Sequence, residues 1–273
     1  MLLRKLHATG NDFLVADSPG PPPAAVAGLC DRHRGIGADG LMILGADDEV
    51  DCTMTLFNAD GGPAEMSGNG IRCLAWVAVH AGLARDDRLV VRTAAGVRTV
   101  DLDLDPTTGD LRSATVDMGP VTFDPAAIPL DAAGALNLEV GYHGVTYHGD
   151  AAGVGNPHLV LFVDDVERAR VTQHGPHLEH DPRFPNGTNI EFVAPSGPDE
   201  LRMRVWERGV GETLSCGTGA CAAAAAAHQR GLVGTQVTVH VPGGDLSVDL
   251  GDTVRLGGPV CHVFDVEVDG VDA

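Results

Sequence analysis

The sequence predicts a mixed α/β (α+β) protein made of two halves of similar design. Three observations support this prediction: strand-like segments recur along the 273 residues, only a few segments have a helical pattern, and one glycine-rich motif occurs twice. The first copy covers Glu65–Cys73 and the second covers Thr213–Cys221. Ser67 and Cys216 each stand directly before the Gly-x-Gly of their copy, 149 residues apart. Each copy runs directly into an alanine-rich apolar stretch.

Strand-like segments alternate with turns through most of the chain. Val100–Leu104, for example, has an apolar residue at every second position. Dense turn signals such as Pro106–Asp110 and Pro242–Gly244 separate the segments. The predicted strands include Leu89–Arg92, Val97–Leu104, His158–Val163, Leu201–Trp206, Gln236–Val241 and Val260–Val268.

Three segments read as helices. Two of them follow the glycine-rich motifs, from Asn69 to about Ala81 and from Thr218 to about Arg230. A shorter helix is expected from Pro23 to about Arg32.

The internal repeat extends beyond the glycine-rich motifs, because Gly10–Phe13 is echoed by Gly155–His158. Each half therefore has an asparagine-bearing turn followed later by a Gly-x-Gly helix start. We expect an N-terminal half over residues 1–115, completed by residues 260–273, and a C-terminal half over residues 116–259. The linker is expected near Thr108–Pro120.

The composition excludes several classes of partner. A formal charge of −20 opposes binding to nucleic acid or to an anionic membrane, so neither is expected.

No run of 18 apolar residues and no signal-peptide pattern occurs, so a cytoplasmic location is expected by default. The sequence contains no Cys-x-x-Cys pair, so a zinc site is not expected. The cysteines are expected to be reduced. Four of them are expected as small buried residues: Cys30, Cys52, Cys73 and Cys261.

The two glycine-rich helix starts carry the chemistry. A helix N-terminus offers free backbone N–H groups and a partial positive charge, which bind carboxylates and lower the pKa of a cysteine placed there. Two such termini could hold one substrate carboxylate between Gly68-Asn69 and Gly217-Thr218, and could stabilise the charge that forms when an α-proton leaves. One copy alone would more often be an ordinary glycine-opened helix. Two matched copies, each preceded by Ser67 or Cys216, favour an enzyme that works on both faces of one carbon.

The whole set of motifs resembles the diaminopimelate epimerase family over nearly the full chain. The residues that carry the resemblance are Gly10–Phe13, Gly35–Gly40, Phe57–Gly61, Gly68–Gly70, Gly155–His158, Asn189, Trp206–Gly209 and Cys216–Ala220. The resemblance implies two pseudo-symmetric domains, each a curved β-sheet or barrel around a central helix, with the active site in the cleft between them. It also implies conversion of L,L-2,6-diaminopimelate to the meso form, used in lysine and cell-wall synthesis, with no cofactor and no metal.

The resemblance further implies a role for each motif residue. Cys216 would be the base for the L,L substrate, Ser67 would stand at the other catalytic position, and His158 with Glu207 would tune these acid/base residues. The substrate-binding residues would be Asn11, Gly40, Asn58, Gly68, Asn69, Asn156, Asn189, Glu207, Arg208, Gly217 and Thr218. Taken singly, each has a structural alternative, since an asparagine in a turn is usually only a turn residue. The substrate is the partner expected, and a homodimer is left open.

Two residues depart from the family pattern. Gly40 stands where many members have glutamine, and Ser67 stands where the family has its first catalytic cysteine. An alcohol is a much weaker acid than a thiol, so Ser67 is a poor base. Cys73 and Cys221 lie more than a helical turn further on and cannot substitute.

Three interpretations remain open from the sequence. The chain is an authentic family member in which Ser67 is a weak acid or a replacement that traps substrate. Alternatively, it is a relative that epimerises or dehydrates another amino acid such as hydroxyproline. The third is a catalytically silent amino-acid-binding homologue.

Overall fold

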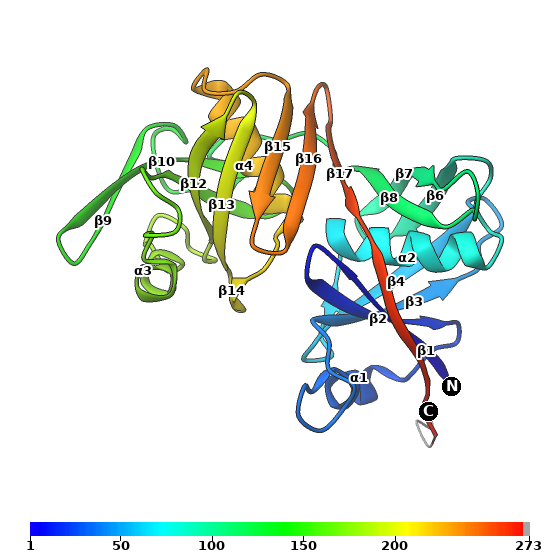
Figure 1. Cartoon of the computed structure of the whole chain (residues 1–273). Helices are drawn as coiled ribbons and strands as arrows, with labels where there is room; N and C mark the ends of the chain where they lie inside the picture. Colours follow the sequence, from blue (N-terminus) through cyan, green and yellow to red (C-terminus); the bar gives the residue numbers. More distant parts are fainter. Residues whose placement is uncertain (270–273) are drawn as a thin grey trace. The chain divides into compact units, whose positions relative to one another are not determined.

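The computed structural model describes residues 1–269, and residues 270–273 of the expected C-terminal return lie outside the described residues. The chain divides into two compact units. Unit 1 is built from Met1–Asp117 together with the segment that begins at Gly257, and unit 2 from Met118–Leu256. Both units are dominated by strands, with a few helices, as the predicted fold class requires (Figure 1).

Unit 1 is a β-sheet structure that closes around one helix, α2. Its strands are β1 (Leu2–Ala8), β2 (Asn11–Asp17), β3 (Gly40–Gly45), β4 (Cys52–Asn58), β5 (Pro63–Ala64), β6 (Arg88–Thr93), β7 (Gly96–Leu104), β8 (Leu111–Asp117) and β18 (Cys261–Glu267). Its helices are α1 (Pro23–Cys30) and α2 (Gly68–His80). Strand β18 pairs antiparallel with β1, so segments from opposite ends of the described chain share this sheet (Figure 1).

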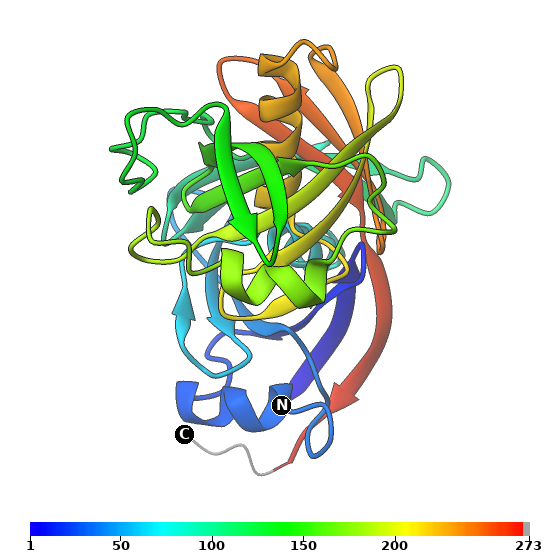
Figure 2. The same ribbon diagram turned by 90° about the vertical axis from the view of Figure 1, so that its left-hand side faces the viewer.

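Helix α2 forms the core of unit 1 because nearly all of its faces are apolar or small. Residues 68–75 are all buried, and the helix contacts β1, β2, β3, β4, β8 and β18. The other helix of unit 1, α1, lies at the end of this unit that carries the N-terminus (Figure 2). It covers a smaller apolar cluster that includes Leu3, Leu14, Val26 and Leu41.

Unit 2 repeats this design around helix α4 (Gly217–Gln229). Its strands are β9 (Leu138–Tyr142), β10 (Val145–Gly153), β11 (Pro157–Phe162), β12 (Asn189–Gly197), β13 (Glu200–Glu207), β14 (Gly211–Thr213), β15 (Gln236–Val241) and β16 (Gly244–Leu250), and β17 (Val254–Pro259) leads out of the unit. Residues Ala220–Ala227 of α4 are all buried, and the helix contacts β10, β11, β12, β13, β15 and β16. Small alanine side chains let the strands approach this helix closely.

The two units also match in strand register. In unit 1, β2 runs parallel to β3 with Phe13 opposite Gly40, and β3 runs antiparallel to β4. In unit 2, β11 runs parallel to β12 with His158 opposite Asn189, and β12 runs antiparallel to β13. The register therefore makes Phe13 equivalent to His158, and Gly40 equivalent to Asn189.

The elements differ from the sequence predictions in a few places. Helix α1 ends at Cys30, two residues early, because the Asp31 carboxylate accepts hydrogen bonds from the backbone N–H groups of His33 and Arg34. Helix α3 (Val171–Leu178) was not predicted, since it contains Gly175 and Pro176.

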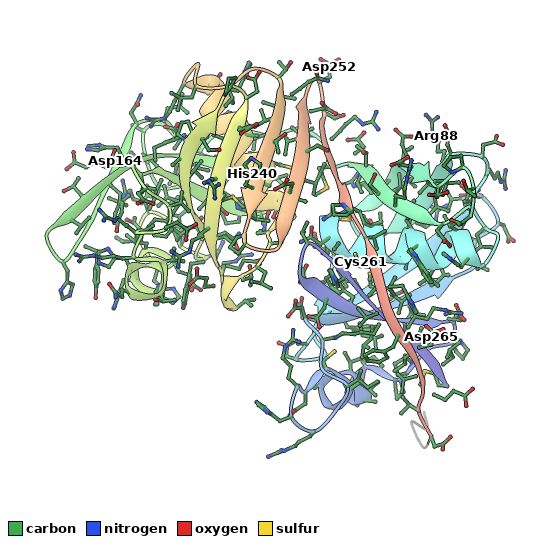
Figure 3. All side chains as sticks on the ribbon, in the orientation of Figure 1. Arg88, Asp164, His240, Asp252, Cys261 and Asp265 are labelled. Atoms are coloured by element: carbon green, nitrogen blue, oxygen red, sulfur yellow. The ribbon has the colours of Figure 1, made fainter. Side chains whose placement is uncertain are left out.

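The prediction that Cys261 is buried was wrong. Cys261 is the first residue of β18 and is exposed to solvent (Figure 3). Strand β18 pairs with β1 through its backbone, but most of its side chains remain exposed. The other three cysteines expected inside, Cys30, Cys52 and Cys73, are buried.

Candidate functional site

The two glycine-rich motifs form matching helix caps. Ser67 precedes α2 with an extended backbone, φ −140° and ψ 120°, and its Oγ accepts a hydrogen bond from the N–H of Gly70 at 3.0 Å. Cys216 precedes α4 with φ −122° and ψ 111°, and its Sγ accepts from the N–H of Gly219 at 3.4 Å. Each helix therefore begins at a residue whose oxygen or sulfur is held at the positive end of the helix dipole.

In unit 1, two asparagines are joined beside the Ser67 cap. The Asn69 amide donates to Asn11 Oδ1 at 3.2 Å, and Arg72, which is wholly buried, donates to Asn69 Oδ1. Asn11 in turn donates to Asp39 Oδ2 at 2.7 Å. The predicted residues Asn11 and Asn69 thus lie in one hydrogen-bonded group with a fixed order of donors and acceptors.

A charged network supports this group from the side of β1 and β2. Arg32 donates to both Asp12 Oδ1 and Asp39 Oδ1 at 2.6 Å, and Lys5 donates to Asp12 and to the carbonyl of Gly37. Burial alone would raise the pKa of Asp12, but the hydrogen bonds from Arg32 and Lys5 outweigh it and lower that pKa to about 2. Asp12 is therefore an ionised, bracing carboxylate.

Gly40 occupies a place with no room for a side chain. It lies at the start of β3, and a Cβ atom added there would be 2.6 Å from the Phe57 carbonyl oxygen and 3.2 Å from the Phe13 ring. A glutamine at this position would require the backbone of β3 or β4 to shift. Asn58, at the end of β4 opposite Gly40, is exposed.

In unit 2, the Cys216 thiol is buried among acidic groups. Its side chain is 4% exposed, and its Sγ lies 3.5 Å from Thr218 Oγ1. Burial, followed by the nearby carboxylates of Glu207 and Glu191, raises the pKa of this thiol well above its ordinary value. The expectation that the helix N-terminus lowers the pKa of Cys216 was therefore wrong, because burial and the two carboxylates outweigh the hydrogen bonds of Thr218 and Gly219, which lower this pKa.

Glu207 is the carboxyl group that interacts directly with the Cys216 thiol. It accepts a hydrogen bond from Thr213 Oγ1 and another from Cys216. Burial and the charge of Glu191 raise its pKa, although these two hydrogen bonds oppose the rise. A carboxyl group with a raised pKa next to a thiol is well suited to exchange a proton with it.

His158 and Glu191 form a buried pair beneath this site. Both side chains are wholly buried, and His158 Nδ1 lies 2.7 Å from Glu191 Oε1. The other ring nitrogen, Nε2, lies 2.8 Å from Asn156 Oδ1. Glu191 was missed by sequence reasoning; the available signal was a lone carboxylate within the apolar strand that begins Asn189-Ile190-Glu191-Phe192.

Asn189 and Arg208 are connected through the backbone. Asn189 Oδ1 accepts from the N–H of Arg208 at 2.9 Å, and Asn189 Nδ2 donates to the Pro157 carbonyl at 2.9 Å. The Arg208 side chain is exposed and donates to the Asn186 carbonyl at 3.1 Å. Asn189 thus holds in place the chain segment that carries Glu207 and Arg208.

The described residues include no group of three or more His, Cys, Asp or Glu side chains arranged to hold a metal ion. Within residues 1–269, no helix has both the length and the apolar character needed to cross a membrane.

Comparison with solved structures defines the class of fold. The structure resembles a hydroxyproline epimerase from Agrobacterium vitis, with a TM-score of 0.71, 18% identity, and 97% and 91% of the two chains covered. It also resembles a predicted epimerase from Pseudomonas aeruginosa, with a TM-score of 0.72, 18% identity, and 98% and 99% coverage. The chain therefore has the fold shared by these epimerases and by a phenazine biosynthesis protein of Bacillus anthracis, which matches with a TM-score of 0.72 at 15% identity over 98% of both chains.

Sequence comparison identifies the family. The sequence profile described as Diaminopimelate epimerase matches residues 3–123 and 151–259. The chain is 42% identical to the diaminopimelate epimerase of Moorella thermoacetica, over 95% of this chain and 96% of that protein. It is 41% identical to the diaminopimelate epimerase of Pelotomaculum thermopropionicum, with 98% of each covered. This chain belongs to the diaminopimelate epimerase family, a family of isomerases.

Proposed function

We propose that this chain interconverts L,L-2,6-diaminopimelate and meso-diaminopimelate by moving a proton on and off the α-carbon, without a metal or an organic cofactor. The observation that carries the proposal is the pair of matching helix caps, Ser67 on α2 and Cys216 on α4. Membership of the family supplies the substrate. The proposal requires the two caps to act on opposite faces of one carbon.

Cys216 acts as the base on one face of the α-carbon. Its thiol proton passes to the Glu207 carboxylate, and the thiolate then takes the α-proton of the substrate. The pKa of Glu207 is raised, which suits it to hold this proton. The charge that develops on the substrate carboxylate is met by the backbone N–H groups of Gly68, Asn69, Gly217 and Thr218 at the two helix starts.

Ser67 acts on the other face as the proton donor. A thiol has a reference pKa of roughly 8.5 and water one of roughly 15.7, so an alcohol is several units weaker as an acid. The equilibrium constant belongs to the substrate, so a weak group at Ser67 lowers kcat/KM equally in both directions. Ser67→Cys is expected to raise kcat/KM by about 10²–10⁴-fold, the usual contribution of a well-matched acid/base group.

The remaining substrate groups are held by polar residues from both units. Asn11 and Asn58 contribute from unit 1, and Asn156, Asn189, Glu207 and Arg208 contribute from unit 2. Gly40 offers the substrate no side chain, because the Phe57 carbonyl oxygen and the Phe13 ring leave no room for one. We further propose a cytoplasmic homodimer, which sedimentation of the purified protein would test.

The experiment is proton NMR of the α-position in D2O with each diastereomer in turn. Because Cys216 can remove and return a proton on its own face while Ser67 stays idle, deuterium should enter one isomer faster than the two interconvert. Ser67→Ala should abolish interconversion but keep this exchange, and Cys216→Ala should abolish both. Unchanged activity in Ser67→Cys, with exchange never faster than epimerisation, would show that Ser67 is not at the catalytic position.

A further inference from the structure

Glu179 is a buried residue at the end of α3 that the proposed mechanism does not use. It is the C-cap of this helix and is 8% exposed. Its Oε2 atom accepts a hydrogen bond from Trp206 Nε1 at 2.8 Å, and its Oε1 atom accepts one from the backbone N–H of Gly209 at 2.9 Å. An indole nitrogen and a backbone amide nitrogen can only donate, so the direction of both hydrogen bonds is unambiguous. Both carboxyl oxygens are therefore engaged by one short segment, Trp206–Gly209.

This segment carries two residues that the proposed function uses. Glu207 is the last residue of β13 and accepts a hydrogen bond from Cys216, and Arg208 follows Glu207 directly. Glu179 holds the residue before this pair, Trp206, and the residue after it, Gly209. Glu207 and Arg208 are thus bracketed by the two oxygen atoms of a single carboxyl group.

The backbone of Glu179 also fixes the loop on which the Arg208 side chain lies. The Glu179 carbonyl oxygen accepts a hydrogen bond from the N–H of Thr188 at 3.0 Å. Just before Thr188, the Asn186 carbonyl accepts from Arg208 Nη1 at 3.1 Å, and a Cβ atom at Gly187 would lie 3.2 Å from Arg208 Cδ. The turn that carries Arg208 and the loop that supports its side chain are therefore both tied to Glu179.

Close packing keeps Trp206 within reach of Glu179. A Cβ atom at Gly175 of α3 would lie 2.6 Å from Trp206 Cγ, so the helix and the indole ring are in direct contact. The ring therefore has no room to move towards α3. Asn189 Oδ1 adds a further restraint on the segment, because it accepts from the N–H of Arg208 at 2.9 Å.

We infer that Glu179 is a positioning residue that places Glu207 against Cys216 and Arg208 against the substrate. The inference deepens the proposed function and rests on it for the roles of Glu207 and Arg208. Glutamine has nearly the same shape as glutamate but only one acceptor oxygen. In Glu179→Gln, one N–H group of the segment would face an amide NH₂ group whichever way the amide lies. That end of the segment would shift, and the bracketed residues would shift with it.

The first test follows the Cys216 thiol and needs no substrate. After the larger effect of burial, the Glu207 carboxylate raises the pKa of this thiol. A displaced Glu207 would raise it less, so the thiolate would form at lower pH. The pH profile of Cys216 alkylation by iodoacetamide, read by peptide mapping, should therefore shift to lower pH in Glu179→Gln. An unchanged profile overturns the inference.

A second measurement uses the wild-type chain alone. Gly209 is exposed to solvent, yet its N–H donates to Glu179. Its amide hydrogen should therefore exchange slowly with D2O, as followed by NMR. Exchange at the rate of an unprotected amide overturns the inference without any variant having to fold.

The third test separates positioning from stability. At a temperature at which circular dichroism shows the variant to be folded, Glu179→Gln should lower kcat/KM for diaminopimelate by about tenfold to 100-fold. The kcat should fall because Glu207 is displaced from Cys216, and KM should rise because Arg208 is displaced from the substrate. Unchanged kinetic constants in the folded variant overturn the inference.

Asp150→Asn is the matched control. Asp150 is also a buried carboxylate of unit 2 that accepts from one backbone N–H, of Asn137, and from one side chain, of Arg230. Arg230 lies at the end of α4 away from Cys216. The kinetic constants of Asp150→Asn should stay within twofold of wild type, and equal losses in the two variants overturn the inference. If the wild-type chain fails to turn over diaminopimelate, the proposed function falls, whereas the alkylation profile and the Gly209 exchange report on Glu179 by themselves.

Discussion

Gly219 offers the most direct test of how the catalytic helix of unit 2 is packed. Replacing it by alanine adds a methyl group 2.7 Å from Glu191 Oε1 and 3.2 Å from Cys216 Sγ. Gly70, its counterpart in α2, would place the same methyl group 3.1 Å from Met42 Sδ and 3.2 Å from Ser67 Oγ. The added methyl group is equally close to the capping residue in both variants. The difference in stability between the variants therefore comes from the second neighbour, which is Glu191 in unit 2 and Met42 in unit 1.

The magnitude follows from what each neighbour can do. Met42 has a flexible thioether that can move away, so the strain in Gly70→Ala is offset by the helix preference of alanine, and the net change stays within about 1 kcal/mol of zero. Glu191 is held by His158 and has nowhere to move. Overpacking costs about 1–3 kcal/mol and a weakened charged hydrogen bond adds about 1.5–3 kcal/mol, so Gly219→Ala should destabilise unit 2 by about 2 kcal/mol or more.

Urea unfolding can follow each unit separately. The chain has 2 tryptophans, Trp76 in α2 of unit 1 and Trp206 in β13 of unit 2, so a Trp→Phe variant of either leaves a fluorescence reporter for the other unit. Gly219→Ala should lower the urea midpoint reported by Trp206, and Gly70→Ala should leave the midpoint reported by Trp76 almost unchanged. Equal midpoints for Gly219→Ala and its parent would refute the close packing of Glu191 against α4.

Two further predictions concern ionisation. The pKa of Asp12 is lowered from 3.8 to about 2 in the folded chain, so this carboxylate stabilises unit 1 above pH 4 and the stabilisation is lost as the pH falls from about 4 towards 2. Removing the ion pair with Arg32→Ala should make unit 1 unfold at a higher pH in an acid titration followed by Trp76 fluorescence, and an unchanged acid midpoint would contradict this. Limited alkylation with peptide mapping should modify Cys261 first, because Cys216 is buried and the pKa of its thiol is raised. Faster labelling of Cys216 in the free protein would show that its thiolate is more accessible than the structure implies.

The sequence could predict the parts of the site that depend on local structure. The helices after Ser67 and Cys216 begin where the Gly-x-Gly motifs indicate, because a capping side chain and small first-turn residues act over a few residues. The roles assigned to Asn11, Asn156 and Arg208 stay predictions that rest on family resemblance and on the proposed experiments. Their positions at strand ends and turns are what the structure adds.

The features that the sequence did not predict depend on contacts between distant segments. The raised pKa of Cys216 arises from burial and then from the carboxylates of Glu207 and Glu191, which lie on two different strands, and no local pattern specifies that these groups converge. Cys261 resembles any small apolar residue at the start of a strand, and its exposure follows from its place on β18, where consecutive side chains on both faces are exposed. Helix α3 forms despite Gly175 and Pro176 because tertiary contacts with β9, β12, β13 and β14 outweigh local preference.

The pairing of β18 with β1 also has a consequence for the order in which the protein is made. Strand β1 is synthesised early, yet one of its partners follows only after every residue of unit 2. Unit 2 is continuous in sequence, so it can finish folding while the β1 edge of unit 1 is still unpaired. Until β18 has been synthesised, the β1 edge of unit 1 stays unpaired. A chaperone that covers exposed strand edges would therefore assist unit 1 rather than unit 2.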